Sequence, residues 1–121
     1  MTTQTLTRNT LSATTLIGDP VRNAKREDLG KIEDLMIDLS TGKVAYAVLN
    51  FGGFLGMGNK LFAVPFKAMT VDTADKCFIL DVPKERLKEA PGFDKDNWPD
   101  VSDLSYRNKI YAFYNTAPDW M

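Results

Sequence analysis

The segment that comes closest to a known chemical motif is the glycine-rich stretch Gly53–Lys60, which reads GFLGMGNK. It has the first glycine and the lysine of a P-loop, the motif that cradles nucleotide phosphates. The lysine is displaced by one position, and Leu61 stands where a Ser or Thr should hold Mg²⁺. The residues that follow also predict a strand, whereas a phosphate site needs the N-terminus of a helix. We therefore reject nucleotide binding at this stretch.

The same stretch carries three large apolar side chains, Phe54, Leu55 and Met57. Two interpretations remain open. In one, the stretch is only a connection between two strands. In the other, the three side chains form an adaptable contact surface for a partner protein, because methionine and exposed apolar patches are typical of such surfaces.

Catalytic chemistry finds little support elsewhere in the chain. There is no histidine, which excludes Ser-His-Asp and Cys-His sites and removes the commonest metal ligand. The single cysteine, Cys77, falls in a predicted strand with no activating group and is expected to be buried. The acidic pairs Glu33-Asp34 and Asp94/Asp96 are typical of solvated strands and loops. The sequence therefore predicts a protein that is not an enzyme and has no catalytic residue, cofactor or metal.

Composition places the chain among ordinary globular proteins. Its 121 residues are enough for one domain, and 44% of them are hydrophobic. The net charge of −1 gives no electrostatic footprint for nucleic acid. No apolar run approaches the roughly 20 residues that cross a bilayer, and the N-terminus lacks the apolar core of a secretory signal. We expect a cytoplasmic protein without an integral membrane segment.

The clearest structural signal is a β-hairpin within Asp28–Gly53. Its turn, Ser40-Thr41-Gly42-Lys43, places Gly42 where positive φ is needed, and Gly30 is a second glycine expected at a structural turn. Apolar alternation breaks near Glu33-Asp34, which predicts a β-bulge. The strand after the turn, Val44–Phe51, is apolar on both faces and must be covered twice.

Other strands are expected at Ser12–Ile17, at Leu61–Val64 before a corner at Pro65, at Phe66–Val71 and at Cys77–Leu80. A short helix is expected within Pro83–Ala90, and a final helix opens near Asp100 or Ser102. Six short strands at close spacing predict a mainly β fold, a small barrel or sandwich.

Four segments together resemble the PRC-barrel domain family: Asp28–Leu35, the Thr41-Gly42 turn, Phe51–Gly56 and Phe62–Phe66. The family's barrel occurs in the H subunit of the photosynthetic reaction centre and in a ribosome-maturation factor. The resemblance spans Ser12 to Pro91 and implies a six-stranded PRC-type β-barrel that serves as an assembly module. Nothing resembles the membrane helix of the former or the extra N-terminal domain of the latter, so neither specific function carries over.

These features predict a flexible tail at residues 1–11, a PRC-like barrel at 12–91 and a C-terminal extension with one helix at 92–121. The expected function is a non-catalytic protein–protein interaction module, most simply a homodimer that hides the excess apolar surface. One alternative is a small-ligand-binding barrel with a regulatory role, its pocket lying under the Phe54–Met57 loop. A competing possibility for the apolar surface is that the final helix folds back and the tail to Trp120 completes a monomeric core.

Overall fold

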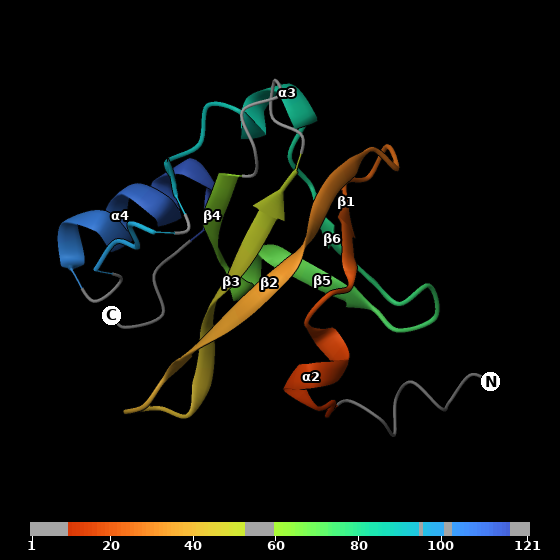
Figure 1. Ribbon diagram of the computed structural model, residues 1–121, viewed down its shortest axis with the longest axis horizontal. Coiled ribbons are helices and arrows are strands. Elements are labelled where there is room, and N and C mark those ends of the chain that lie inside the picture. Colours follow the sequence, from red (N-terminus) through yellow and green to blue (C-terminus); the bar gives the residue numbers. More distant parts are fainter. Residues whose placement is uncertain (1–9, 53–59, 95, 101–102, 117–121) are drawn as a thin grey trace.

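A computed structural model describes residues 10–52, 60–94, 96–100 and 103–116 of the chain. The predicted mainly β fold is confirmed, as a mixed sheet of seven strands in the order β5-β6-β1-β2-β3-β4-β7 (Figure 1). The strands are β1 (Pro20–Arg22), β2 (Asp28–Asp38), β3 (Lys43–Phe51), β4 (Lys60–Pro65), β5 (Met69–Asp72), β6 (Cys77–Leu80) and β7 (Gly92–Phe93). Neighbouring strands are antiparallel except β1 and β6, which are parallel.

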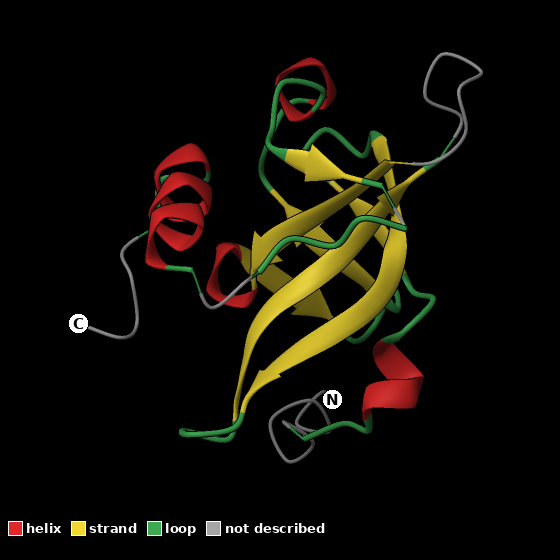
Figure 2. Ribbon diagram, turned by 60° about the vertical axis from the view of Figure 1, so that its left-hand side comes forward, coloured by secondary structure: helices red, strands yellow, loops and turns green. Residues whose placement is uncertain are grey.

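The β2–β3 hairpin is the longest feature of the sheet, and it extends beyond the other strands (Figure 2). Ile32 pairs with Leu49 and Asp34 pairs with Val48, so Glu33 is the extra residue of a bulge, as predicted. A second bulge lies on the partner strand β3: Met36 pairs with Tyr46 and Ile37 with Val44, which leaves Ala45 as the extra residue. These two bulges increase the local twist of the hairpin.

Two glycines of this hairpin have positive φ for different reasons. Gly42 lies in the turn at φ +76, with nothing within 4 Å of the position a Cβ would occupy. Gly30 was predicted at a turn, and this is wrong: it lies inside β2, at φ +123. A Cβ there would overlap the backbone carbonyl of Asn50 in β3. Gly30 therefore allows a close approach of two strands.

The core gathers around both faces of β3. Tyr46, Ala47, Val48, Leu49 and Phe51 are all at most 5% exposed. Helix α4 (Leu104–Phe113) lies beside β4 in Figure 1, and its Ile110 and Tyr111 belong to the same buried cluster. The final helix therefore covers the sheet of its own chain, whereas the tail to Trp120, which the monomeric-core alternative also needs, lies outside the described residues.

Three predictions about individual elements need correction. Ser12–Ile17 is not a strand: Ala13–Leu16 form helix α2, because the Ser12 side chain accepts a hydrogen bond from Thr15 N and caps it. The expected strand Phe66–Val71 begins with a 3₁₀ turn, η2 (Phe66–Ala68), before β5. The seventh strand, β7, pairs with β4 and was not predicted.

The remaining helix, α3 (Lys84–Leu87), lies within the predicted segment Pro83–Ala90. Helix α4 begins after the N-cap residue Asp103, whose side chain accepts a hydrogen bond from Ser105 N. In the part of the chain that the structure describes, no helix has the length and apolar character that crossing a membrane requires.

Candidate functional site

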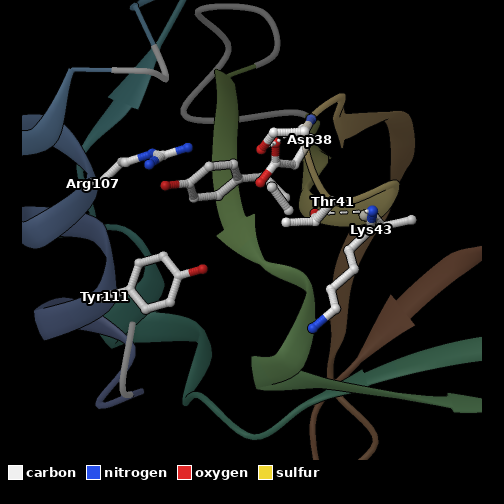
Figure 3. Close-up of a pocket in the computed structure, with 9 residues that line it drawn as sticks. Asp38, Thr41, Lys43, Arg107 and Tyr111 are labelled. Atoms are coloured by element: carbon white, nitrogen blue, oxygen red, sulfur yellow. Dashed lines mark hydrogen bonds between the residues drawn. The ribbon is translucent and has the colours of Figure 1, made fainter. Parts of the chain in front are cut away.

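A cleft of about 360 Å³ separates the turn of the β2–β3 hairpin from helix α4 (Figure 3). In the close-up, Arg107 and Tyr111 reach from α4 toward the hairpin, which carries Asp38, Thr41 and Lys43 on the opposite wall. The residues that line the cleft are Asp38, Ser40, Thr41, Lys43, Val44, Ala45, Tyr46, Arg107 and Tyr111. All of them except Val44 and Ala45 have polar or charged side-chain groups, so the site combines hydrogen-bonding groups with a small apolar floor.

The hairpin wall is fixed by short-range hydrogen bonds. Asp38 Oδ1 accepts hydrogen bonds from Ser40 N at 3.0 Å and from Ser40 Oγ at 2.8 Å. Lys43 N donates to Thr41 Oγ1 at 3.2 Å. The bonds from Ser40, with smaller contributions from Thr41 and Arg107, lower the pKa of Asp38. The carboxylate is therefore ionised at neutral pH, and one of its oxygens is already engaged within the turn.

The opposite wall follows from the spacing of α4. Arg107 and Tyr111 are four residues apart and therefore lie on the same helix face. The Tyr111 ring is buried and meets the Tyr46 ring of β3 edge to face, with centroids 6.0 Å apart and planes at 80°. Arg107 is half-buried beside them. This aromatic contact fixes the helix against the sheet and sets the width of the cleft.

Tyr46 closes the inner end of the cleft. Its side chain is 1% exposed, and its hydroxyl has no well-formed hydrogen bond among the described residues. Burial, followed by the neighbouring Tyr111, raises the pKa of Tyr46 to about 12. The Arg107 guanidinium acts in the opposite direction, close enough to lower that pKa but without the geometry of a formed hydrogen bond. At neutral pH Tyr46 is therefore a protonated, buried donor.

The chemistry of the cleft is dominated by donors. Arg107 and Lys43 carry only donors, whereas the Tyr46 hydroxyl is shielded from solvent. Asp38 is the one carboxylate of the lining. Among the described residues no group of three or more His, Cys, Asp or Glu side chains is placed to hold a metal ion. The arrangement suits a ligand that presents acceptor atoms.

Sequence reasoning did not identify this cleft. Its two walls come from the hairpin turn and from a helix more than sixty residues later, and no local motif joins them. One signal was present in the sequence. The spacing of the final helix places Arg107 and Tyr111 on one face, next to the apolar Ile110. This spacing identifies a helix face that carries both polar and apolar side chains, but it does not show that the hairpin turn lies across from that face.

Those residues singled out from the sequence that the structure describes are not brought together. Phe54, Leu55 and Met57 lie outside the described residues. Cys77 is buried in β6, and Asp94 and Asp96 are exposed.

The acidic pair of β2 serves local contacts. Glu33 Oε1 accepts a hydrogen bond from Asn50 Nδ2 at 2.9 Å, and Asp34 Oδ1 accepts one from Leu35 N at 2.8 Å. Both acidic side chains are on the exposed surface of the bulge. They therefore support the hairpin and form no carboxylate pair facing a pocket.

One similar solved structure is that of the 16S ribosomal RNA processing protein RimM from Pseudomonas aeruginosa, with a TM-score of 0.43 and 18% sequence identity. The match covers 64% of this chain and 46% of that chain, so this chain spans less than half the length of that protein. No curated protein matches the chain. The PRC-barrel domain matches residues 8–87, which include strands β1 to β6. The chain therefore belongs to the PRC-barrel domain family.

Proposed function

We propose that this PRC-barrel protein is a non-catalytic assembly module that joins a second copy of its own chain through the outer part of the β2–β3 hairpin. We name this part the hairpin arm and define it as residues 34–45. The observation that carries the proposal is an apolar row that leaves the core toward the turn. Leu35 packs partly against the core, Ile37 follows on the same face of β2, and Leu39 lies in the turn, so that exposure rises to 49% at Ile37 and 92% at Leu39.

Backbone pairing supports the same surface. Strand β1 pairs with β2 no further than Lys31, and in the described residues no strand pairs with Asp34–Asp38 on the side away from β3. An open edge beside exposed aliphatic side chains invites another strand. A two-fold axis at Ile37 would place Leu35 of one copy opposite Leu39 of the other. It would also keep Asp34 away from Asp38, which avoids facing like charges.

The non-catalytic part of the proposal rests on composition and on the family. The chain has no histidine, and PRC-barrel domains are typically non-catalytic. The cleft lining has one carboxylate, Asp38, and therefore holds no pair of carboxylates for acid–base chemistry. These observations favour a binding role over a chemical one.

Light scattering of the full chain tests the assembly. At micromolar concentration we expect a mass near twice the 13.5 kDa of one chain. Leu39→Asp should return the mass to that of one chain, because in each half of the contact it places a charge opposite Leu35 of the other copy. Leu11→Asp is the matched control, since Leu11 is also an exposed leucine, at 43%, but lies outside the hairpin arm.

Two results would contradict the proposal. One is a wild-type mass of a single chain that does not change on concentration. The other is a dimer that survives Leu39→Asp, or that Leu11→Asp disrupts equally, because the contact would then lie elsewhere.

A further inference from the structure

We propose that α4 is a strap that opens from the sheet as a unit while the strands stay paired, and that Arg86 is the latch that holds it closed. Arg86 lies in α3, within the segment 8–87 that matches the family domain, whereas α4 lies beyond that segment. The strap is separate from the assembly role, because neither α3 nor α4 belongs to the hairpin arm.

Arg86 completes the C-terminal end of α4. Asn115 adopts a left-handed conformation at φ +53, so that the chain turns back on the helix. Backbone N–H groups of residues 114–116 then donate to the carbonyl groups of Ile110, Tyr111 and Ala112. The carbonyl group of Phe113 accepts its hydrogen bond from Arg86 Nη2, at 3.0 Å. One side chain of α3 therefore ties down the last turn of α4.

The latch has a defined geometry and a modest net strength. The guanidinium carbon of Arg86 lies 4.5 Å from the centroid of the Phe113 ring, within the range of a cation–π contact. Its positive charge also lies at the negative end of the helix dipole. Arg86 is exposed and Phe113 is half-buried, so water competes for both groups. The contact therefore favours the closed strap without making it permanent.

Closing α4 also buries polar groups at a cost. The hydroxyl oxygens of Tyr106 and Tyr114 are shielded from solvent and have no hydrogen-bond partner among the described residues. Burial, followed by the neighbouring Tyr106, raises the pKa of Tyr114, so this phenol is protonated and uncharged. A hydroxyl that loses its hydration without a partner destabilises the state that buries it. Opening the strap would return both hydroxyls to water.

The sheet is held together in a different way. Strand β3 has backbone pairing on both sides, to β2 and to β4. Helix α4 is attached to the sheet by side chains, of which Ile110, Tyr111 and Tyr114 are buried. Segments with fewer buried contacts open at a lower free energy than the core strands. We therefore expect α4 to open before the sheet unfolds.

Opening uncovers one face of the sheet. Tyr46 and Val48 share the face of β3 against which the Tyr111 ring packs, and Val48 pairs with Ala63 of β4. These three side chains of the sheet are at most 1% exposed while the strap is closed. The cleft of Figure 3 loses its α4 wall at the same time. The latch therefore sets how often this apolar face is available to another molecule.

Native-state hydrogen exchange of the ¹⁵N-labelled full chain, followed by NMR, tests the strap. After correction for the intrinsic rate of each amide, the amides of Ile110 and Tyr111 should exchange at least about tenfold faster than those of Val48 and Leu49. Low concentrations of urea should accelerate the β3 amides more than the α4 amides, because global unfolding exposes more surface than opening of one helix.

Two variants separate opening of the strap from global unfolding. Arg86→Gln should accelerate exchange of the α4 amides about threefold to tenfold, because the latch is broken when α4 opens. Ile32→Val, at the fully buried base of the hairpin, should accelerate the β3 amides by a similar factor and leave the α4 amides unchanged. The reason is that Ile32 keeps its contacts when only the strap opens.

Two further variants test the latch and the buried hydroxyl. Lys88→Gln is the matched control for charge: Lys88 is also exposed, but it pairs with Glu85 of α3, so its loss should leave α4 unchanged. Tyr114→Phe should slow exchange of the α4 amides about threefold, because closing then buries no hydroxyl at this position. Melting curves show whether each variant is folded.

The proposal is overturned by any of three results. Ile32→Val could accelerate the α4 amides as much as the β3 amides, which would mean that α4 opens only when the sheet unfolds. Lys88→Gln could accelerate α4 as much as Arg86→Gln does, or Tyr114→Phe could fail to slow it. Should Arg86→Gln fail to fold, Ile32→Val and Tyr114→Phe still decide. Light scattering, which tests assembly, is independent of all these outcomes.

Discussion

The β2–β3 hairpin has two ends that differ in what covers them. At its base Ile32 faces Leu49, and both side chains are at most 1% exposed. Toward its turn Ile37 is 49% exposed and Leu39 is 92% exposed, although they are residues of the same kind. The difference lies in the neighbours: β1 pairs with β2 only as far as Lys31, and β4 pairs with β3 only from Tyr46 onward.

This contrast shows that apolar type alone does not place a side chain in the core. At the base, flanking strands and helices remove aliphatic groups from water, which stabilises the fold. In the hairpin arm the same groups gain little from folding and are available for contacts with another molecule. One hairpin thus has a structural end and an end suited to binding.

A pair of glycine substitutions gives the largest expected contrast between the ends. Gly30→Ala at the base should lower the free energy of unfolding by about 4 kcal/mol, because a Cβ meets the Asn50 carbonyl and φ is +123. Gly42→Ala at the turn should cost only about 1 kcal/mol, since its φ of +76 is strained but the surrounding space is open. Urea unfolding measures both.

Equal losses for the two glycine variants would break the comparison. They would mean that backbone conformation alone sets the cost and that the close approach of β2 and β3 at Gly30 adds nothing.

Two leucine substitutions test burial in the same way. Leu49→Ala should destabilise by about 3 kcal/mol, because Leu49 is fully buried and its removal leaves a cavity. Leu39→Ala should stay within about 0.5 kcal/mol of wild type. The measurement is chemical unfolding at the lowest workable protein concentration, so that self-association does not contribute. A large loss for Leu39→Ala under these conditions would show that the arm is covered within one chain.

The sequence predicted the hairpin well because its signals are local. Gly42 in a polar turn, the apolar run from Val44 and the paired acids at the bulge all act through neighbouring residues. Strand β6 matches the predicted range Cys77–Leu80 for the same reason. Such features depend on backbone preferences and on alternation, which a single sequence displays.

Other features depend on contacts between distant segments and could not be predicted in this way. The short strand β7 exists because Phe93 pairs with Leu61 of β4. Gly30 looks like a turn residue until the Asn50 carbonyl is placed beside it. The cleft requires α4 to pack on the sheet before Arg107 can oppose Asp38. The segment containing Phe54 lies outside the described residues, so its proposed partner contact stays a prediction.

Tyr46 marks the boundary between the two ends of the hairpin. It is the last residue of β3, counting toward the turn, that pairs with β4, and it is buried, whereas Val44 and Ala45 beyond it are half-buried. Its hydroxyl has no well-formed hydrogen bond among the described residues. Tyr46→Phe therefore removes a buried polar group at little cost, and at neutral pH the variant should be within about 0.5 kcal/mol of wild type.

Wild type and Tyr46→Phe should differ in stability only at alkaline pH. Burial raises the pKa of Tyr46 to about 12, whereas an unfolded tyrosine titrates near 10. Between these two values the folded chain therefore keeps a proton that the unfolded chain loses. The contribution of this group to stability is complete below about pH 10 and is lost as pH rises toward about 12. Melting temperatures should consequently fall less steeply with pH above about 10 for Tyr46→Phe than for wild type. Tyr106 and Tyr114, whose pKa values burial also raises, are present in both proteins, so the difference between the curves reports mainly on Tyr46. If the melting temperatures of both proteins fell equally with pH, the Tyr46 hydroxyl would be exposed to water. The covered base of the hairpin would then end nearer to Val48.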